Sequence, residues 1–387
     1  MRICLVYDCL YPWTVGGAER WMRDLAERLV ADGHEVTYLT RLQWDPHDAP
    51  AIPGVRVVAV SRREELYGPD GNRTVGEPLR FGWGVLRHLL RHRRAYDAVH
   101  TCSFPYFSVL AARAALAGTG VRIGVDWFEV WGKRYWRRYL GGPRGWVGWL
   151  VQRLCVLATP QAFVFSRLHG ERLREEGLRR EPVRLGGLYA GPVVPRDGDA
   201  PAAGSHGEPP LVVFAGRHIA EKRAPSVPAV VMAARARVPD VRGLVLGDGP
   251  ERPQVLEAIE SSGASEVVGA PGFVGADEVR DAFARAACLL LPSSREGYGL
   301  VVIEAAAAGT PSVVVAGEDN AAVELVEDGV NGFVAPSEDP RAVAEAIARC
   351  IEGGAELRAS TAAWFAERAP ELSVAASAER VLAEYRR

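Results

Sequence analysis

The sequence lacks the features of a membrane-spanning or secreted chain. No run of about 18 apolar residues, the length needed to cross a bilayer, occurs anywhere. Residues 1–10, MRICLVYDCL, have no charged segment followed by a long apolar stretch and a small-residue cleavage site. We therefore expect a cytoplasmic protein and leave open a peripheral contact with the inner face of the membrane.

Neither sign of charge predominates, and the cysteines lack a regular spacing. The 46 Lys and Arg side chains oppose 48 Asp and Glu, for a net charge of -2 at pH 7. So balanced a charge does not indicate nucleic acid as a partner. The six cysteines show no paired spacing typical of a disulfide framework or a metal site, so we expect buried thiols and no metal. The cysteines are Cys4, Cys9, Cys102, Cys155, Cys288 and Cys350.

The length of 387 residues predicts two domains, since one domain usually contains about 100 to 200 residues. In residues 1–194 short apolar runs alternate with amphipathic helices, which is typical of a parallel, doubly wound sheet. Residues 195–210, PRDGDAPAAGSHGEPP, interrupt this alternation and are interpreted as a linker. The alternation begins again in residues 211–369. The expected fold class is therefore α/β, with two doubly wound domains in tandem and a ligand-binding cleft between them.

The elements that we expect follow from the apolar periodicity. Strands are expected in the first domain at 3–7, 36–40, 55–60, 98–100, 121–125 and 162–165. Strands are expected in the second domain at 211–214, 243–246, 288–291 and 312–315. Helices are expected at 18–32, 81–91 and 373–385, among others.

The most informative segment is REGYGLVVIEAAAAGTP, which begins at Arg295 after a predicted strand. Gly297 and Gly299 let the backbone approach a ligand, and the N–H groups of the helix that follows would point at an anion. Glu296 precedes this helix and Glu304 lies about one turn inside it, so the two carboxylates would flank the anion. The alternative is a tight turn whose glutamates are solvated or cap the helix. Two glutamates beside a Gly-x-Gly turn favour a functional site.

Two cations follow the first predicted strand of the second domain, in the segment FAGRHIAEKR at 214–223. Ligands of doubly wound domains lie at the carboxyl ends of strands, where Arg217 and Lys222 could hold a diphosphate. Surface charge at a strand end is the alternative. Only Lys133 and Lys222 among the 46 basic residues are lysines, and so rare a lysine favours a specific role for Lys222.

A third glycine-rich turn, VGGAER at 15–20, lies between the first strand and the first helix. Gly16 and Gly17 would bring helix N–H groups to a phosphate. The spacing is not the Gly-x-Gly-x-x-Gly fingerprint of dinucleotide binding, which disfavours a nicotinamide-dependent enzyme. A simple tight turn is an equally good interpretation of this motif alone.

Together these segments resemble the retaining glycosyltransferases of family 4, which have two facing Rossmann-like domains in the GT-B arrangement. The resemblance covers essentially the whole chain and rests on five motifs in the order of the family. The motifs are GGAE at 16–19, GR at 216–217 with EK at 221–222, GDGP at 247–250, GFVG at 272–275, and the segment from Glu296 to Glu304 with GTP at 309–311 behind it. The resemblance implies a metal-independent enzyme that uses a UDP- or GDP-linked sugar as co-substrate and no other cofactor. It also implies that the last helix, within 370–387, crosses back onto the first domain.

The resemblance implies a role for each residue of the donor site. Arg217 and Lys222 would bind the diphosphate and stabilise its departure. Glu296 would contact the transferred sugar, and Glu304 would hold the ribose hydroxyls. Further donor contacts are expected from Gly16, Gly17, Gly247, Phe273, Val274, Gly297, Tyr298, Gly299 and Leu300.

The first domain departs from the family pattern near the reacting sugar. Relatives commonly place a histidine in the turn after the strand predicted at 121–125, and Phe128 takes that position here. Asp126 or His100, at the ends of neighbouring strands, could supply the missing polar contact, so Asp126 is a catalytic candidate. A buried structural role is the alternative for both. The acceptor candidates are His100, Trp127, Phe128, Glu129 and Trp131.

Residues 127–153 interleave five tryptophans with six cations. Three interpretations are open. The segment could meet an anionic bilayer and a lipid-linked acceptor, or it could form an aromatic pocket for a small acceptor. It could also be aromatic core packing with arginines on the wet face.

The function that we expect is retaining transfer of a sugar to a small specialised metabolite. A membrane lipid-linked or cell-envelope acceptor is the alternative within the same class. A GT-B-like sugar-nucleotide epimerase is a second alternative, and a sugar-nucleotide-binding subunit is the non-enzyme alternative. The expected partners are therefore a small-molecule donor and acceptor.

Overall fold

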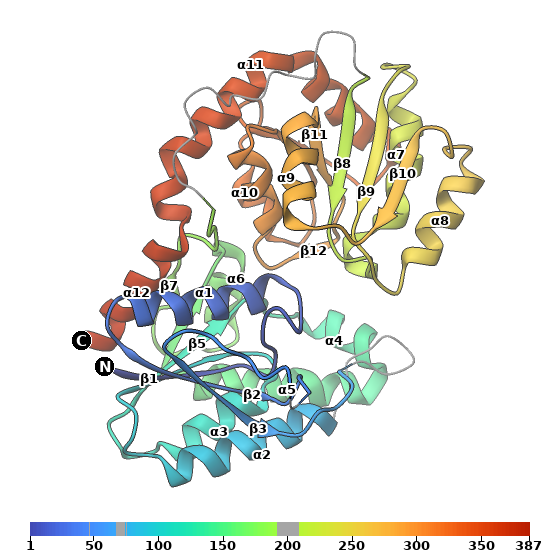
Figure 1. Ribbon diagram of the computed structural model, residues 1–387. Coiled ribbons are helices and arrows are strands. Elements are labelled where there is room, and N and C mark those ends of the chain that lie inside the picture. The colour runs from blue at the N-terminus through green and yellow to red at the C-terminus, as the bar shows by residue number, and fades with distance from the viewer. Residues whose placement is uncertain (46, 67–73, 75, 192–208) are drawn as a thin grey trace. The chain divides into compact units, whose positions relative to one another are not determined.

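The computed structural model describes residues 1–45, 47–66, 74, 76–191 and 209–387. Of the predicted linker 195–210, only Pro209 and Pro210 lie within the described residues. The chain forms two compact units, which we call the first and second unit (Figure 1). The first unit contains residues 1–190 and 371–387, and the second contains residues 191–370.

The first unit is built on a seven-stranded parallel sheet in the order β3-β2-β1-β4-β5-β6-β7. The strands are β1 (Arg2–Val6), β2 (Glu35–Arg41), β3 (Val55–Ser61), β4 (Ala98–Cys102), β5 (Arg122–Trp127), β6 (Gln161–Val164) and β7 (Val183–Arg184). The helices are α1 (Gly17–Ala31), α2 (Gly76–Arg91), α3 (Phe107–Ala115), α4 (Lys133–Leu140), α5 (Gly142–Ala158), α6 (Arg167–Glu175) and α12 (Val374–Arg386). Figure 1 shows α1, α6 and α12 on one side of this sheet and α2 and α3 on the other.

Helices cover both faces of this sheet, which explains why its central strands β1, β4, β5 and β6 are buried at nearly every position. Cys4 and Val6 of β1 pack in one core with Phe81 of α2 and Val109 of α3. On α1, Trp21 is among the buried residues that face the protein interior. All six cysteines are buried free thiols, as predicted.

The second unit has a six-stranded parallel sheet in the order β10-β9-β8-β11-β13-β15 and a two-stranded parallel sheet, β12-β14. The strands are β8 (Leu211–Ala215), β9 (Arg242–Leu246), β10 (Val268–Gly272), β11 (Cys288–Leu291), β12 (Arg295–Glu296), β13 (Ser312–Val315), β14 (Asp319–Asn320) and β15 (Gly332–Ala335). The α-helices are α7 (Val227–Ala234), α8 (Arg252–Ser261), α9 (Ala276–Arg285), α10 (Leu300–Ala307) and α11 (Pro340–Leu372). Three short 3-10 helices are η1 (Ala220–Lys222), η2 (Ala224–Ser226) and η3 (Ala321–Leu325).

Alternate residues of β8 face opposite helical layers of the second unit. Val212 and Phe214 pack with buried residues of α7, α8 and α11. Val213 packs instead with residues of α9 and α10. This period of two buries both faces of the sheet and leaves the carboxyl ends of its strands as the place for polar loops.

The predicted fold class of two parallel-sheet α/β domains is confirmed. The strands predicted at 288–291 and 312–315 have the same bounds as β11 and β13. The sequence did not predict β7, β10 or β15, nor the two-residue strands β12 and β14. Those two strands follow β11 and β13, and they hold the polar residues described next.

Candidate active site

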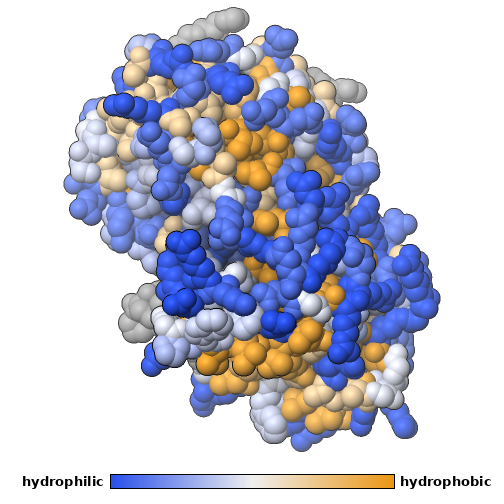
Figure 2. All heavy atoms as spheres, turned by 180° about the vertical axis from the view of Figure 1, so that it is seen from behind, coloured by the Kyte–Doolittle hydropathy of each residue, from blue (hydrophilic) through white to orange (hydrophobic). Residues whose placement is uncertain are grey.

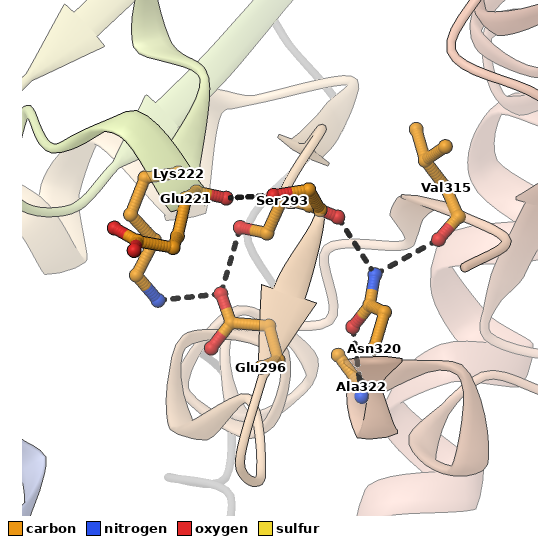
Figure 3. Close-up of polar contacts among 8 residues, drawn as sticks. Glu221, Lys222, Ser293, Glu296, Val315, Asn320 and Ala322 are labelled. Carbon is orange, nitrogen blue, oxygen red and sulfur yellow. Dashed lines mark hydrogen bonds and ion pairs between the residues drawn. The ribbon is translucent and has the colours of Figure 1, made fainter. Parts of the chain in front are cut away.

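A lysine and a glutamate meet beside the carboxyl end of β8. Lys222 ends η1, and its Nζ lies 2.5 Å from Oε1 of Glu296 in β12. The same oxygen accepts a hydrogen bond of 2.8 Å from the hydroxyl of Ser293 (Figure 3). The Glu296 side chain is 7% exposed and that of Lys222 is 22% exposed. The pair therefore combines a fixed carboxylate with a cation that a ligand can reach.

The backbone around Glu296 is held by one asparagine. Asn320 of β14 donates its amide hydrogens to the carbonyl oxygens of Ser293 (3.1 Å) and Val315 (2.8 Å). Its Oδ1 accepts from the backbone N–H of Ala322 at 3.0 Å. Figure 3 shows Asn320 between these groups on the side of β12 away from Lys222. One buried side chain thus joins the ends of β11 and β13 and positions β12.

A second set of contacts joins β12 to η1. The backbone N–H of Ser294 donates to the carbonyl oxygen of Glu221 at 2.8 Å. The guanidinium of Arg295 donates to the Glu221 carboxylate at 3.2 Å. Because Glu221 precedes Lys222, these contacts fix the position from which Lys222 extends.

Gly299 is required at the start of α10. It precedes Leu300 in the left-handed region, with φ of 101°, where side chains are strained. A Cβ at Gly299 would also lie 2.7 Å from the Cβ of Ala322. The glycine lets α10 begin at Leu300, shortly after Glu296 in the chain, and the N-terminus of a helix is a place where an anion can bind.

The other predicted donor residues of the second unit follow the carboxyl ends of its strands. Arg217 follows β8 and is exposed, and Gly247 follows β9 with φ of 123°. Phe273, 70% exposed, and the half-buried Val274 follow β10. Gly297 and Tyr298 lie between β12 and α10, and burial raises the pKa of Tyr298. Glu304 is half-buried within α10.

The loops after β8 and β9 are bonded to each other through a histidine that the sequence did not single out. The backbone N–H of His218 donates to the carbonyl oxygen of Asp248 at 2.8 Å, and the N–H of Glu251 donates to the His218 carbonyl at 2.9 Å. His218 is fully buried, and burial, followed by the charge of Arg252, lowers the pKa of its ring. These bonds fix the backbone next to Arg217. A polar residue directly after Gly-Arg at a strand end was the available signal.

In the first unit, Gly16 and Gly17 form the start of α1. Gly16 caps the helix with extended backbone, and its carbonyl oxygen accepts from the N–H of Arg20 at 3.1 Å. A Cβ on Gly17 would meet no atom within 4 Å. Glu19, in the first turn, is buried. The turn therefore leaves open space at Gly17, as a close approach to a ligand would need.

His100 and Asp126 belong to a buried network. Oδ2 of Asp126 accepts from Nε1 of Trp21 at 2.6 Å and lies 2.8 Å from Nε2 of His100. Nδ1 of His100 lies 2.7 Å from the hydroxyl of Tyr385, on α12. His100 and Asp126 are both 0% exposed. This geometry fits the structural alternative, because the network joins β4, β5, α1 and α12 within the first unit and gives Asp126 no exposed atom.

The remaining acceptor candidates have different surroundings. Trp127 is fully buried and donates to the hydroxyl of Thr159 at 3.3 Å, so it belongs to the core. Phe128 is half-buried and stacks on Phe165, with ring centroids 4.9 Å apart and an interplanar angle of 7°. The other two, Glu129 and Trp131, are half-buried and bonded to each other through Nε1 of Trp131 at 2.7 Å.

An open cavity of about 360 Å³ lies beside the Lys222 segment in the second unit. Its lining includes Arg223, Ser226, Glu251 and Glu338, and Arg223 forms a salt bridge with Glu338. The predicted donor residues are not among its described lining residues, so the cavity is a neighbour of the candidate site. Within the described residues, no group of three or more His, Cys, Asp and Glu side chains could hold a metal ion.

Two family models match the chain, one in each unit. Residues 16–186 match a model described as glycosyl transferase 4-like domain, and residues 209–353 match one described as glycosyl transferases group 1. Each match covers less than half of the chain.

Proteins of similar sequence include named glycosyltransferases from bacteria. The chain is 28% identical over 375 residues to the D-inositol 3-phosphate glycosyltransferase of Xylanimonas cellulosilytica, which covers 91% of this chain and 88% of that protein. It is 29% identical over 143 residues to the alpha-D-kanosaminyltransferase of Streptomyces kanamyceticus, which covers 37% of this chain and 36% of that protein. The chain thus matches only about a third of the length of some relatives.

Solved structures share the fold over the full chain. The sucrose-phosphate synthase of Thermosynechococcus elongatus has a TM-score of 0.77 at 20% identity, covering 100% of this chain and 98% of that one. The Anabaena protein Alr3699/HepE in complex with UDP has a TM-score of 0.72 at 16% identity, covering 99% of each chain. Each of the two parallel-sheet units thus matches a glycosyl transferase model, and the fold of the chain is the GT-B fold of these solved structures.

Proposed function

We propose that this chain transfers a sugar from a nucleoside-diphosphate-sugar to an acceptor hydroxyl, with retention at the anomeric carbon and without a metal ion. The observation that carries the proposal is the Lys222–Glu296 pair, whose glutamate lies just ahead of α10 in the chain. A cation paired with a carboxylate, followed in the chain by the start of a helix, suits a sugar joined to a diphosphate.

Lys222 and Arg217 are proposed to stabilise the leaving diphosphate. Negative charge builds on the diphosphate oxygens as the bond to the sugar breaks, so fixed cations interact more strongly with the transition state than with the bound donor. The N–H groups at the start of α10 add to this stabilisation. These donors supply the charge that a divalent metal would otherwise provide.

The two glutamates are proposed to orient the donor. Glu296, held by Ser293 and Lys222, would accept hydrogen bonds from hydroxyls of the transferred sugar. Glu304, about one turn further along α10, would accept from the ribose hydroxyls. Neither is proposed as a glycosidase-type acid or nucleophile.

Retention is proposed to follow from attack on the face that the diphosphate leaves. A bond forms between the acceptor oxygen and the anomeric carbon, and the bond from that carbon to the phosphate oxygen breaks. The acceptor proton passes to the departing phosphate oxygen. No protein nucleophile is needed. Asp126 stays a prediction as a catalytic group, although its burial favours the structural role.

The proposed donor is UDP- or GDP-linked, and the proposed acceptor is a small specialised metabolite. UDP is supported by the solved relative that was crystallised with it. A small acceptor is supported by the relative that matches most of the chain, which is named for D-inositol 3-phosphate. A lipid-linked acceptor is the second candidate, because α5 exposes several large apolar side chains.

A thermal-shift screen with UDP, GDP, ADP and TDP tests the donor assignment. A ligand that binds only the native state raises its stability, so at least one nucleotide is expected to raise the Tm of the wild-type protein. Lys222→Met is expected to remove most of that shift. Lys133→Met is the matched control, since Lys133 lies on α4 of the first unit, over the ring of Trp149 at 4.3 Å. If the nucleotide raised the Tm of Lys222→Met and Lys133→Met by the same amount, the proposal that the nucleotide binds at Lys222 would be wrong.

Product analysis with a labelled donor tests the reaction. Release of the nucleotide with transfer of the label, in the anomeric configuration of the donor, is the expected result. Conversion of the donor to an epimer would favour the epimerase alternative. Nucleotide binding without even slow donor hydrolysis would favour a binding subunit.

A further inference from the structure

Helix α5 is apolar on its exposed face as well as on its buried face. Its only polar side chains are those of Arg144, Gln152 and Arg153. Cys155 and Val156 are buried in the core of the first unit. A helix that is apolar all round is normally covered on every side. The outer face of α5 is instead exposed.

The exposed apolar residues of α5 form one stripe. They recur at helical spacing over three turns of the helix. They are Trp146 (49% exposed), Val147 (62%), Leu150 (50%), Leu154 (48%) and Leu157 (40%). Figure 2 shows apolar side chains gathered in a band on this side of the first unit, with hydrophilic residues along its borders. Contiguous apolar surface of this kind marks a binding surface.

The charged residues of α4 and α5 are all cations. Between Glu129 and Glu171 the sequence has no acidic residue, although the whole chain has a net charge of -2. Helix α4, which packs on α5, exposes three arginines, and a fourth is exposed at the start of α5. The four are Arg134, Arg137, Arg138 and Arg144. Throughout the described part of the chain, none of these four takes part in a salt bridge.

We propose that the surface formed by the exposed residues of α4 and α5, the α4–α5 surface, binds a lipid bilayer that contains anionic lipids. The leucines and Trp146 enter the region between headgroups and acyl chains, and the arginines bind lipid phosphates. Apolar area flanked by cations, with tryptophan at its edge, is the combination that such a surface requires. No helix among the described residues is long and apolar enough to cross a membrane, so this contact lies on one leaflet.

Charge decides between a bilayer and another occupant. A second copy of this chain would bring the same four arginines against the first set, and like charges repel. An anionic bilayer neutralises all of them. Membrane binding through the α4–α5 surface does not depend on the proposed donor site. Nucleotide binding by the second unit is therefore measured separately, and either result can fail without the other.

Vesicle co-sedimentation of the full chain tests the proposal. The wild-type protein is expected to bind vesicles of phosphatidylcholine with phosphatidylglycerol, to bind phosphatidylcholine alone weakly, and to dissociate as salt rises. Leu150→Gln combined with Leu154→Gln is expected to weaken binding about tenfold or more. Arg137→Gln and Arg138→Gln are each expected to weaken binding to the anionic vesicles about fivefold.

A matched control is available on α2. Trp83 is 65% exposed there, more than Trp146 on α5. Trp146→Gln is expected to weaken vesicle binding, whereas Trp83→Gln is expected to bind as the wild type does. Each variant is checked for an unchanged Tm and unchanged nucleotide binding, so that unfolding is not mistaken for lost docking.

Three outcomes would overturn the proposal. The first is a wild-type protein that does not bind anionic vesicles at low salt. The second is an equal loss of binding in Trp83→Gln and Trp146→Gln. The third is a wild-type dimer, seen by light scattering without lipid, that the leucine substitutions convert to a monomer, because the surface would then join two copies.

Discussion

The two units each place a carboxylate near the carboxyl end of a strand, but solvent reaches only one of the two sites. In the first unit, Asp126 and its partner His100 are both 0% exposed, and the side chains of Trp21 and Tyr385 complete the network. In the second unit, the partner of Glu296 is Lys222, whose side chain is 22% exposed. A polar residue at a strand end can thus serve either the fold or a ligand. The exposure of its partner distinguishes the two cases.

The largest expected effect concerns activity at the exposed pair. Lys222→Met is expected to lower kcat/KM for sugar transfer by about 100- to 1,000-fold, the effect of removing one fixed donor from a developing negative charge. Glu296→Gln keeps the shape of the side chain and removes its charge, and it is expected to lower kcat with a small change in Tm. Steady-state kinetics and thermal unfolding of each variant provide the check. If kcat/KM were unchanged in Lys222→Met, the claim that the exposed Lys222–Glu296 pair serves a ligand would be wrong.

The next effect concerns stability at the buried network. Asp126→Ala leaves the indole N–H of Trp21 and the ring of His100 without their acceptor in a buried position. The free energy of unfolding in urea is expected to fall by about 3 kcal/mol. Nucleotide binding, measured below the unfolding transition, is expected to stay as in the wild type. If Asp126→Ala unfolds at the wild-type urea concentration but loses sugar transfer, then Asp126 is catalytic and the structural interpretation is wrong.

Substitutions at two glycines separate a role in the fold from a role in ligand binding. Gly299→Ala forces a side chain into a left-handed position and against Ala322, and it is expected to cost about 1 to 3 kcal/mol of stability and to weaken nucleotide binding. Gly17→Ala meets no atom within 4 Å and is expected to leave stability nearly unchanged. If Gly17 lies close to a donor phosphate, Gly17→Ala will still raise KM for the donor. Equal stability of the two variants would contradict the assigned backbone of Gly299.

The smallest effect is expected at the edge of the buried network. Tyr385→Phe removes only the hydroxyl that lies 2.7 Å from His100. The loss of one buried hydrogen bond is expected to cost about 1 kcal/mol in the free energy of unfolding. Sugar transfer should be unaffected. A loss of transfer without loss of stability would link α12 to the reaction.

Local sequence patterns predicted the fold and the start of α10 better than they predicted side-chain partners in the candidate site. The bounds of β11 and β13 and the start of α10 at Leu300 follow from apolar runs and glycines close by in the chain. The strand pair β12-β14 escaped prediction because each strand has two residues and depends on the side chain of Asn320. Such a contact, across 27 positions of sequence, leaves no periodic signal.

In the first unit too, contacts between residues far apart in the sequence could not be predicted. The sequence placed His100 and Asp126 at neighbouring strand ends, and β4 and β5 do pair there. It did not show that Trp21 and Tyr385 bond to them, because Tyr385 lies 285 positions from His100. The outer face of α5 was ambiguous for a related reason. Aromatic and arginine residues at mixed spacing are compatible with a core or with a binding surface until the exposure of each residue is known.

The central claim is that Lys222, the cation of the Lys222–Glu296 pair, binds the diphosphate of the donor, and calorimetric titration tests it most directly. The nucleoside diphosphate that gives the largest thermal shift is titrated into the wild-type protein, Lys222→Met and Lys133→Met. We predict that Lys222→Met weakens binding by about tenfold or more, as expected for a lost charge-assisted contact, and that Lys133→Met binds as the wild type does. Equal affinities for all three proteins would contradict the claim.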